Sequence, residues 1–206
     1  MGLRISGGTA RGREILARKG PDTRPTSAKS RSGLFDILRP RMAGSRWLDL
    51  YAGNGTIGLE ALSRGADYVV FAERHRDACR MITTNVAKLG FGEQTFLWCG
   101  EVLKLLSQYQ AEPFDIAFFD PPWGTDNYRD TLRWLTERNL VRPDGLIIAE
   151  HRKEDLPQAV VGDWQRIRTA DYGDTHSSFY PIQGDHTAVP DDEAEPQDGE
   201  AEPEQD

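Results

Sequence analysis

Three glycines that follow a short apolar run form the first stretch of this chain with the residue types of a ligand site. Gly53, Gly55 and Gly58 lie in the stretch 49–58, between that apolar run and a helical pattern. Glycines placed there permit a tight turn and a close approach of the backbone to a ligand. Glu73 ends the next apolar run, roughly 20 residues on, where a carboxylate can hold the two hydroxyls of a ribose. A dinucleotide-binding oxidoreductase would satisfy both features.

Two further details disfavour that interpretation. Asp49 stands just before the glycine-rich turn, where a carboxylate would face a ligand ammonium and would repel a pyrophosphate. Asp120-Pro121-Pro122-Trp123 directly follows the fourth apolar run. Ligands of open parallel sheets bind beyond the carboxyl ends of the strands, near the switch in strand order. We therefore expect both motifs to converge on one cleft, flanked by the first and fourth strands of the sheet.

These two motifs resemble those of known enzymes. The stretch 49–58 looks like the S-adenosylmethionine loop of class I methyltransferases, and 120–123 looks like the (Asp/Asn)-Pro-Pro-aromatic signature of enzymes that methylate planar amino groups. Further matches are Arg4-Ile5-Ser6-Gly7-Gly8, Arg11-Gly12-Arg13, Thr23-Arg24-Pro25-Thr26 with Arg31 and Phe35, and the run from Gly58 to Ala66. Together, over residues 3–182, they resemble the RsmD family, bacterial enzymes that methylate the exocyclic N2 of one guanine in 16S ribosomal RNA.

The resemblance implies S-adenosyl-L-methionine as the cofactor and a set of site residues. Thr26 is implied to close over the methionine end of the cofactor, and Glu101 stands where the family usually places an acidic contact to the adenine amine. The implied cofactor-binding residues are Asp49, Tyr51, Gly53, Asn54, Gly55, Glu73, Glu101 and Thr26. The implied catalytic residues are Asp120, Pro121, Pro122 and Trp123.

The chemistry of an exocyclic amine explains the implied catalytic residues. Its lone pair is delocalised into the base, which makes it a poor nucleophile. The carboxylate of Asp120 and the carbonyl of Pro121 can accept both N–H bonds and localise the lone pair towards the methyl group. A sulfonium is already a strong leaving group, so we expect no metal and no protein nucleophile. Trp123 is expected to stack on the target base.

Each of these assignments has a purely structural alternative. The glycines could form an ordinary strand-to-helix turn, and Glu73 could be a solvated strand end. Asp120 could cap a helix, and Trp123 could belong to the core.

The elements that must hold these residues alternate between strands and helices. The expected strands are 47–51, 68–73, 95–99, 114–119 and 145–150, and the expected helices are 56–64, 76–89, 102–109 and 128–138. Strands this apolar, separated by helices, indicate a parallel sheet covered on both faces. With 164–169 and 177–182 as a closing antiparallel pair, we predict a doubly wound, mostly parallel seven-stranded α/β sheet, which is Rossmann-like.

The charge is divided unevenly along the chain. Residues 1–46 carry +8, residues 47–183 carry −6, and residues 184–206 carry −10. A basic front on an acidic body suits a polyanion, although it could equally be a solvated surface. The residues expected to contact RNA phosphates are Arg11, Arg13, Arg24 and Arg31.

Three segments follow from these patterns. Residues 1–45 are expected to form a basic extension, with a β-hairpin from 4–8 and 12–16 and a helix that carries Leu34, Phe35 and Leu38 on one face. Residues 46–183 are the expected methyltransferase domain. Residues 184–206 are rich in Asp, Glu and Pro and are expected to be a disordered acidic tail.

Composition narrows the class further. The mean hydropathy is −0.60, and no apolar run approaches the roughly 18 residues of a membrane helix. The N-terminus has no apolar signal-peptide core, so we expect a cytoplasmic protein. Cys79 and Cys99 argue against a disulfide framework and a structural zinc site, and both are expected to be buried small residues.

The resemblance, added to these patterns, implies an S-adenosylmethionine-dependent guanine-N2 methyltransferase of 16S ribosomal RNA, which we expect to be a monomer. The resemblance implies that the substrate is a partly or fully assembled small subunit, so ribosomal proteins could form part of the recognised surface. One alternative is a DNA adenine-N6 methyltransferase, although no insertion here could supply its usual target-recognition domain. A protein glutamine-N5 methyltransferase usually has Asn in place of Asp120. Another alternative is a non-catalytic ribosome assembly factor on the same fold.

Overall fold

A computed structural model of the chain describes residues 3–17, 28–122, 126–184 and 189. The helices are α1 (Ala28–Leu38), α2 (Thr56–Ser63), α3 (Arg76–Leu89), α4 (Val102–Gln108) and α5 (Asn127–Glu137). The strands are β1 (Leu3–Arg4), β2 (Glu14–Ile15), β3 (Arg46–Leu50), β4 (Tyr68–Glu73), β5 (Thr95–Cys99), β6 (Phe114–Phe119), β7 (Val141–His151), β8 (Val160–Val161), β9 (Trp164–Gln165), β10 (Arg168–Asp171) and β11 (His176–Tyr180).

The central feature is a seven-stranded sheet in the order β10-β11-β7-β6-β3-β4-β5. The pairs of β3 with β4 and β6, of β4 with β5, and of β6 with β7 are parallel, whereas β11 is antiparallel to β7 and β10. The chain therefore builds the sheet outwards in two directions from the neighbours β3 and β6. This confirms the predicted doubly wound, mostly parallel sheet, and it places the switch in strand order between β3 and β6.

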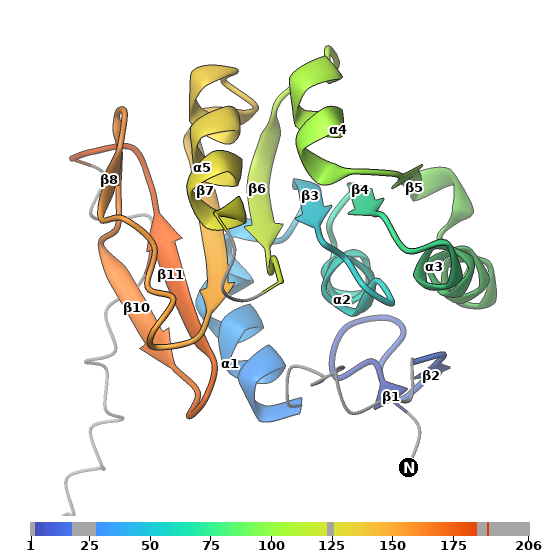
Figure 1. Cartoon of the computed structure of the whole chain (residues 1–206). Coiled ribbons are helices and arrows are strands. Elements are labelled where there is room, and N and C mark those ends of the chain that lie inside the picture. Colours follow the sequence, from blue (N-terminus) through green and yellow to red (C-terminus); the bar gives the residue numbers. More distant parts are fainter. Residues whose placement is uncertain (1–2, 18–27, 123–125, 185–188, 190–206) are drawn as a thin grey trace, which may run out of the picture.

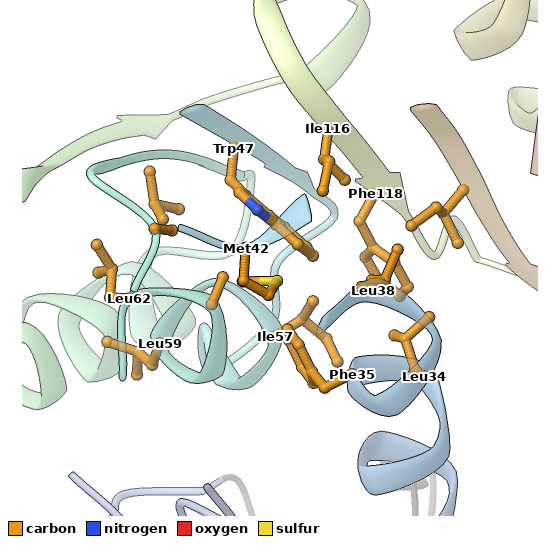
Figure 2. Packing of buried hydrophobic residues seen from close by; sticks show 14 of the residues in the cluster. Leu34, Phe35, Leu38, Met42, Trp47, Ile57, Leu59, Leu62, Ile116 and Phe118 are labelled. Atoms are coloured by element: carbon orange, nitrogen blue, oxygen red, sulfur yellow. The ribbon is translucent and has the colours of Figure 1, made fainter. Parts of the chain in front are cut away.

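Helices cover both faces of the sheet, as Figure 1 shows, with α1, α2 and α3 on one face and α4 and α5 on the other. Each face has its own hydrophobic cluster because the central strands are apolar on both sides. On the first face, Phe35 of α1 stacks on Trp47 of β3 with ring centroids 5.7 Å apart. Figure 2 shows Leu38, Ile57 and Phe118 around the same contact. These contacts hold α1 and α2 against the sheet.

The N-terminal segment contributes to this cluster. β1 and β2 pair as a short antiparallel hairpin, and Ile5, Ile15 and Leu34 are buried in the first cluster. Val189 is buried in the same cluster, whereas most of the expected acidic tail lies outside the described residues.

Two expected boundaries differ from the structure. β7 begins at Val141, four residues before the expected start, because Val141 already pairs with Phe114 of β6; the pairing then shifts register at the Pro-Asp-Gly stretch of β7 before Leu146 pairs with Ile116. The closing pair is β10 with β11, so that Trp164 belongs instead to the short hairpin of β8 and β9. Within the described residues, no helix is long and apolar enough to cross a membrane.

Candidate active site

The two sequence motifs lie on adjacent strands at the switch in strand order. Leu50 at the end of β3 is in register with Phe119 at the end of β6. The backbone N–H of Asp120 lies 3.5 Å from the carbonyl oxygen of Leu50. The sheet therefore places the Asp120-Pro121 step next to the glycine-rich turn, as predicted from the positions of the motifs.

The glycine-rich turn leaves its backbone open. Gly53 has a φ of 55°, and a Cβ added to it would meet no atom within 4 Å. Gly58 serves packing instead, because a Cβ there would lie 2.3 Å from the ring of Phe71. The exposed backbone at Gly53 and the close packing at Gly58 are the two uses of glycine expected at a nucleotide-type loop.

Glu73 is held rigidly beneath this turn. Its two carboxylate oxygens accept the backbone N–H groups of Gly53 at 2.8 Å and His75 at 2.7 Å. Each carboxylate oxygen has a second lone pair that can still accept a hydroxyl. The carboxylate at the end of β4 is thus oriented by the loop that a ribose would contact.

Asp49, which is buried, and Asp120, which is half-buried, form an electrostatically coupled acidic pair. The carboxylate of Asp49 accepts the N–H of Gly58 at 2.9 Å. Burial raises the pKa of Asp49 to about 7, against the lowering effect of that bond, and the charges of Asp120 and Glu73 contribute to the increase. Burial also raises the pKa of Asp120 to about 7. Two such carboxyls are costly to ionise together unless a cation lies beside them.

This set of residues fits S-adenosylmethionine. Asp49, Glu73 and Asp120 give the edge of the sheet an acidic character that matches a sulfonium and an ammonium and opposes a pyrophosphate. The open backbone at Gly53 supplies a surface for close approach. These observations favour a cationic nucleoside over the dinucleotide considered above.

The remaining described cofactor candidates occupy different surroundings. Glu101 precedes α4 and is exposed, and its carbonyl accepts the indole N–H of Trp98 at 3.3 Å. The side chain of Asn54 accepts the hydroxyl of Thr56 at 2.7 Å, so it stabilises the turn itself. Tyr51 adopts a φ of 58°, and its hydroxyl lies 2.9 Å from the hydroxyl of Thr131 on α5.

Asn85 of α3 was not among the residues predicted from the sequence, and its side chain is fully buried next to the turn. Its amide donates to the carbonyls of Leu16 and Asn54 at 3.0 and 3.1 Å, and its oxygen accepts the N–H of Leu16 at 2.7 Å. Asn85 therefore ties the N-terminal segment to the glycine-rich turn. The sequence does carry one signal for Asn85: its polar amide lies on the helix face that the apolar Ile82 and Leu89 otherwise form.

The predicted RNA contacts divide into different environments. Arg11 is exposed, as a phosphate contact requires. The guanidinium of Arg13 donates to the carbonyls of Leu89 and Lys88, and so it caps the end of α3.

The prediction for Arg31 is wrong. Only 2% of its surface is exposed, and its Nε lies 3.5 Å from a carboxylate oxygen of the fully buried Glu60. Arg64 shares the same carboxylate at 3.3 Å, and its guanidinium lies 4.9 Å from the ring centroid of Phe35. Arg31 thus holds α1 against α2 and is not available to a phosphate.

The prediction that both cysteines are buried holds for Cys79 and is wrong for Cys99, which is exposed, and the two do form a disulfide. The parallel pairing of β4 with β5 sets Cys99 beside Glu73, next to the first turn of α3, which carries Cys79. The Cα atoms of Cys79 and Cys99 are therefore 6.0 Å apart, within the range that a disulfide requires. Thr26, Trp123 and Arg24 lie outside the described residues, so their predicted roles stay predictions.

The amino-acid sequence of the chain matches those of a known protein family. A family model described as conserved hypothetical protein 95 matches residues 3–181. Ribosomal RNA small subunit methyltransferase D of Haemophilus influenzae is 33% identical over 168 residues, which are 81% of this chain and 86% of that protein. The protein of the same name from Escherichia coli K12 is 31% identical and covers 81% of this chain and 83% of its own length.

A solved structure shows the same similarity in three dimensions. The Escherichia coli protein yhhF, described as a candidate methyltransferase, superposes with a TM-score of 0.76 at 30% identity, over 86% of this chain and 96% of that one. The family match spans the N-terminal hairpin, the glycine-rich turn and the Asp120 motif together. On these grounds the chain belongs to the conserved hypothetical protein 95 family, which is the RsmD family.

Proposed function

We propose that this protein is an S-adenosylmethionine-dependent methyltransferase that modifies the exocyclic N2 of a guanine in 16S ribosomal RNA. One observation carries the proposal. Asp49 and the glycine-rich turn that follows β3, whose backbone is accessible at Gly53, lie beside the Asp120-Pro121 step that follows β6, at the switch in strand order. The names of the relatives, ribosomal RNA small subunit methyltransferases, support RNA as the substrate.

Two groups of residues have separate proposed roles, one in binding the cofactor and one in activating the guanine amine. S-adenosylmethionine supplies an electrophilic methyl on a sulfonium, which is a strong leaving group. Glu73, oriented by Gly53 and His75, binds the ribose hydroxyls, and Asp49 neutralises the positive charge of the cofactor. The carboxylate of Asp120 and the carbonyl of Pro121 accept the two N–H bonds of the guanine amine. Its lone pair would then be directed at the methyl group, so that the N–C bond would form as the sulfonium–methyl bond breaks and leaves a neutral thioether. The proton that the amine loses would pass to the carboxylate of Asp120 or to water, and the rate gain would come from position and charge.

The proposed RNA surface is basic and includes Arg11 and, from the part of the chain outside the described residues, Arg24. Arg31 is left out of this set because it is buried. The proposed substrate is the rRNA within the small subunit, where ribosomal proteins contribute to the contact, and the proposed site of action is the cytoplasm.

The decisive experiment measures transfer of labelled methyl from S-adenosylmethionine to small subunits, naked 16S RNA and duplex DNA in parallel. The modified nucleoside is identified by digestion and mass spectrometry. The expected product is N2-methylguanosine in ribosomal RNA. N6-methyladenine in DNA would replace the proposal with the adenine-N6 activity.

The variant Asp120→Ala separates an enzyme from a binding factor. We expect methyl transfer to fall on the order of 10²–10³-fold, because the main acceptor for the amine is lost. Binding to small subunits, measured by sedimentation, should persist. Asp163→Ala, which removes an exposed carboxylate elsewhere, is the matched control and should leave both unchanged. Unchanged transfer in Asp120→Ala would contradict the assigned role.

A further inference from the structure

Tyr51 has an unusual backbone conformation for its residue type. Its φ of 58° lies in the left-handed region, which is strained for a non-glycine residue because the Cβ approaches the following carbonyl oxygen. The conformation directs the ring away from the glycine-rich turn and into the cluster on the opposite face of the sheet, beside α5. There its hydroxyl meets that of Thr131 at 2.9 Å, and Thr131 is fully buried. The strained backbone is therefore compensated by a specific contact.

The helix that Tyr51 contacts is the one that follows the Asp120-Pro121 step. α5 begins at Asn127, and its buried face carries both Tyr128 and Thr131. The hydroxyl of Tyr128 donates to the carbonyl of Glu150 on β7 at 3.1 Å. The first two turns of α5 are thus hydrogen-bonded on one side to β7 and on the other to the residue after β3.

We propose that the hydroxyl pair of Tyr51 and Thr131 is a positioning device, which sets the Asp120-Pro121 step at its working distance from the cofactor turn. This inference rests on the proposed methyl transfer. In-line displacement requires the amine and the methyl group to be aligned, and a misplacement of about 1 Å can cost on the order of 100-fold in rate. Tyr51 directly follows Leu50, whose carbonyl oxygen lies 3.5 Å from the backbone N of Asp120, and Thr131 shares α5 with Tyr128, which interacts electrostatically with Asp120. The bond therefore adds to the strand pairing that sets the two halves of the site beside each other.

The test is a double-mutant cycle of Tyr51→Phe and Thr131→Val. We expect each single variant to lower the single-turnover rate of methyl transfer about 10-fold, because loosening α5 misaligns the amine. The double variant should lose no more than either single variant, since both remove the same bond. The Kd of S-adenosylmethionine, measured by calorimetry, should stay within about twofold.

Two further variants separate positioning from stability. Thr131→Ser keeps the hydroxyl and should retain most of the rate. Tyr180→Phe removes the hydroxyl of a buried tyrosine on β11, which donates to the carbonyl of Gln158 at 3.0 Å; in the sheet, β7 separates β11 from the strand that ends at the Asp120 motif. This control should lose stability but not rate.

Three results would overturn the inference. They are unchanged rates in both single variants, losses that multiply in the double variant, and a loss confined to the Kd of S-adenosylmethionine. Failure of the inference is distinct from failure of the proposed function. If the wild-type protein methylates ribosomal RNA and the variants match it, only the positioning role is wrong, whereas a wild-type protein without that activity contradicts the function itself.

Discussion

At the scale of single residues, the site is defined by carboxyls that are difficult to ionise. Asp49 is buried and Asp120 is half-buried, their charges interact, and removal from water raises the pKa of each to about 7. A bound cation would lower both pKa values because it stabilises the charged forms. In the proposed function, cofactor binding and amine activation are therefore coupled through charge.

The pH dependence of the reaction follows from this pair. Because the pKa of Asp120 is raised to about 7, its accepting carboxylate predominates only above that pH in the free enzyme. We expect kcat/KM to rise with pH through about 7, and the midpoint for kcat to lie lower because the bound cofactor is cationic. Initial rates across this pH range check the prediction. Asp120→Asn cannot ionise, and a rise that persists in this variant would assign the titration to another group.

At the scale of elements, two contacts join elements that lie beside the site. The Arg31–Glu60–Arg64 group joins α1 to α2, and the disulfide joins α3 to the end of β5. Both contacts lie beside the elements that carry Asp49, Glu73 and Glu101. None of the residues that form them has a role in the proposed reaction.

Arg31→Met tests the structural role of that residue. It leaves the carboxylate of Glu60 buried with one cation fewer, and removing one partner of a buried ion pair costs about 3–5 kcal/mol. In urea unfolding we expect the free energy of unfolding to fall by an amount near the lower end of this range, because Arg64 still pairs with Glu60. The affinity of the folded variant for RNA should equal that of the wild type. A reduced affinity with unchanged stability would return Arg31 to the RNA surface.

Reduction of the Cys79–Cys99 bond tests the link between α3 and β5. The two cysteines are 20 residues apart, and closing a loop of that length stabilises a protein by about 3 kcal/mol in the chain-entropy account. Dithiothreitol should therefore lower the free energy of unfolding of the wild-type protein by about this amount. The double variant Cys79→Ser/Cys99→Ser serves as the control and should not respond to the reductant. Equal unfolding curves with and without reductant in the wild-type protein would contradict the prediction.

At the scale of the whole molecule, charge is segregated along the chain. Residues 1–46 carry +8 although the net charge is −8, so the attraction for a polyanion is local. The electrostatic part of RNA binding acts through release of counterions from the phosphates.

Binding to RNA should accordingly weaken steeply with salt. A plot of log affinity against log salt is expected to be linear, with a slope of about −0.7 for each phosphate contact on single-stranded RNA. Arg11→Met should reduce the magnitude of the slope by about one contact. Fluorescence anisotropy over a series of salt concentrations measures it. A flat plot would contradict the electrostatic role of the basic segment.

The sequence by itself determined the parts of this protein that depend on short stretches of chain. Apolar runs and glycine positions predicted the strands, the helices and their order, and the two motifs predicted where the sheet would switch direction. Asp49, Glu73 and Asp120 could be located because each directly follows or ends a strand, and parallel strands end at one edge.

Only the tertiary structure decided what side chains from distant elements do to one another. Arg31 is indistinguishable from Arg11 in a basic segment until α1 packs on Glu60, and Cys99 meets Cys79 only once β5 lies beside β4. The bond of Tyr51 to Thr131 joins residues 80 positions apart. Such contacts depend on the packing of whole elements and leave no periodic or local signal in the chain. For this reason the sequence predicted which acidic residues end the strands at the site, whereas the side-chain contacts of Arg31, Cys99 and Tyr51 were decided only by the packing of the elements.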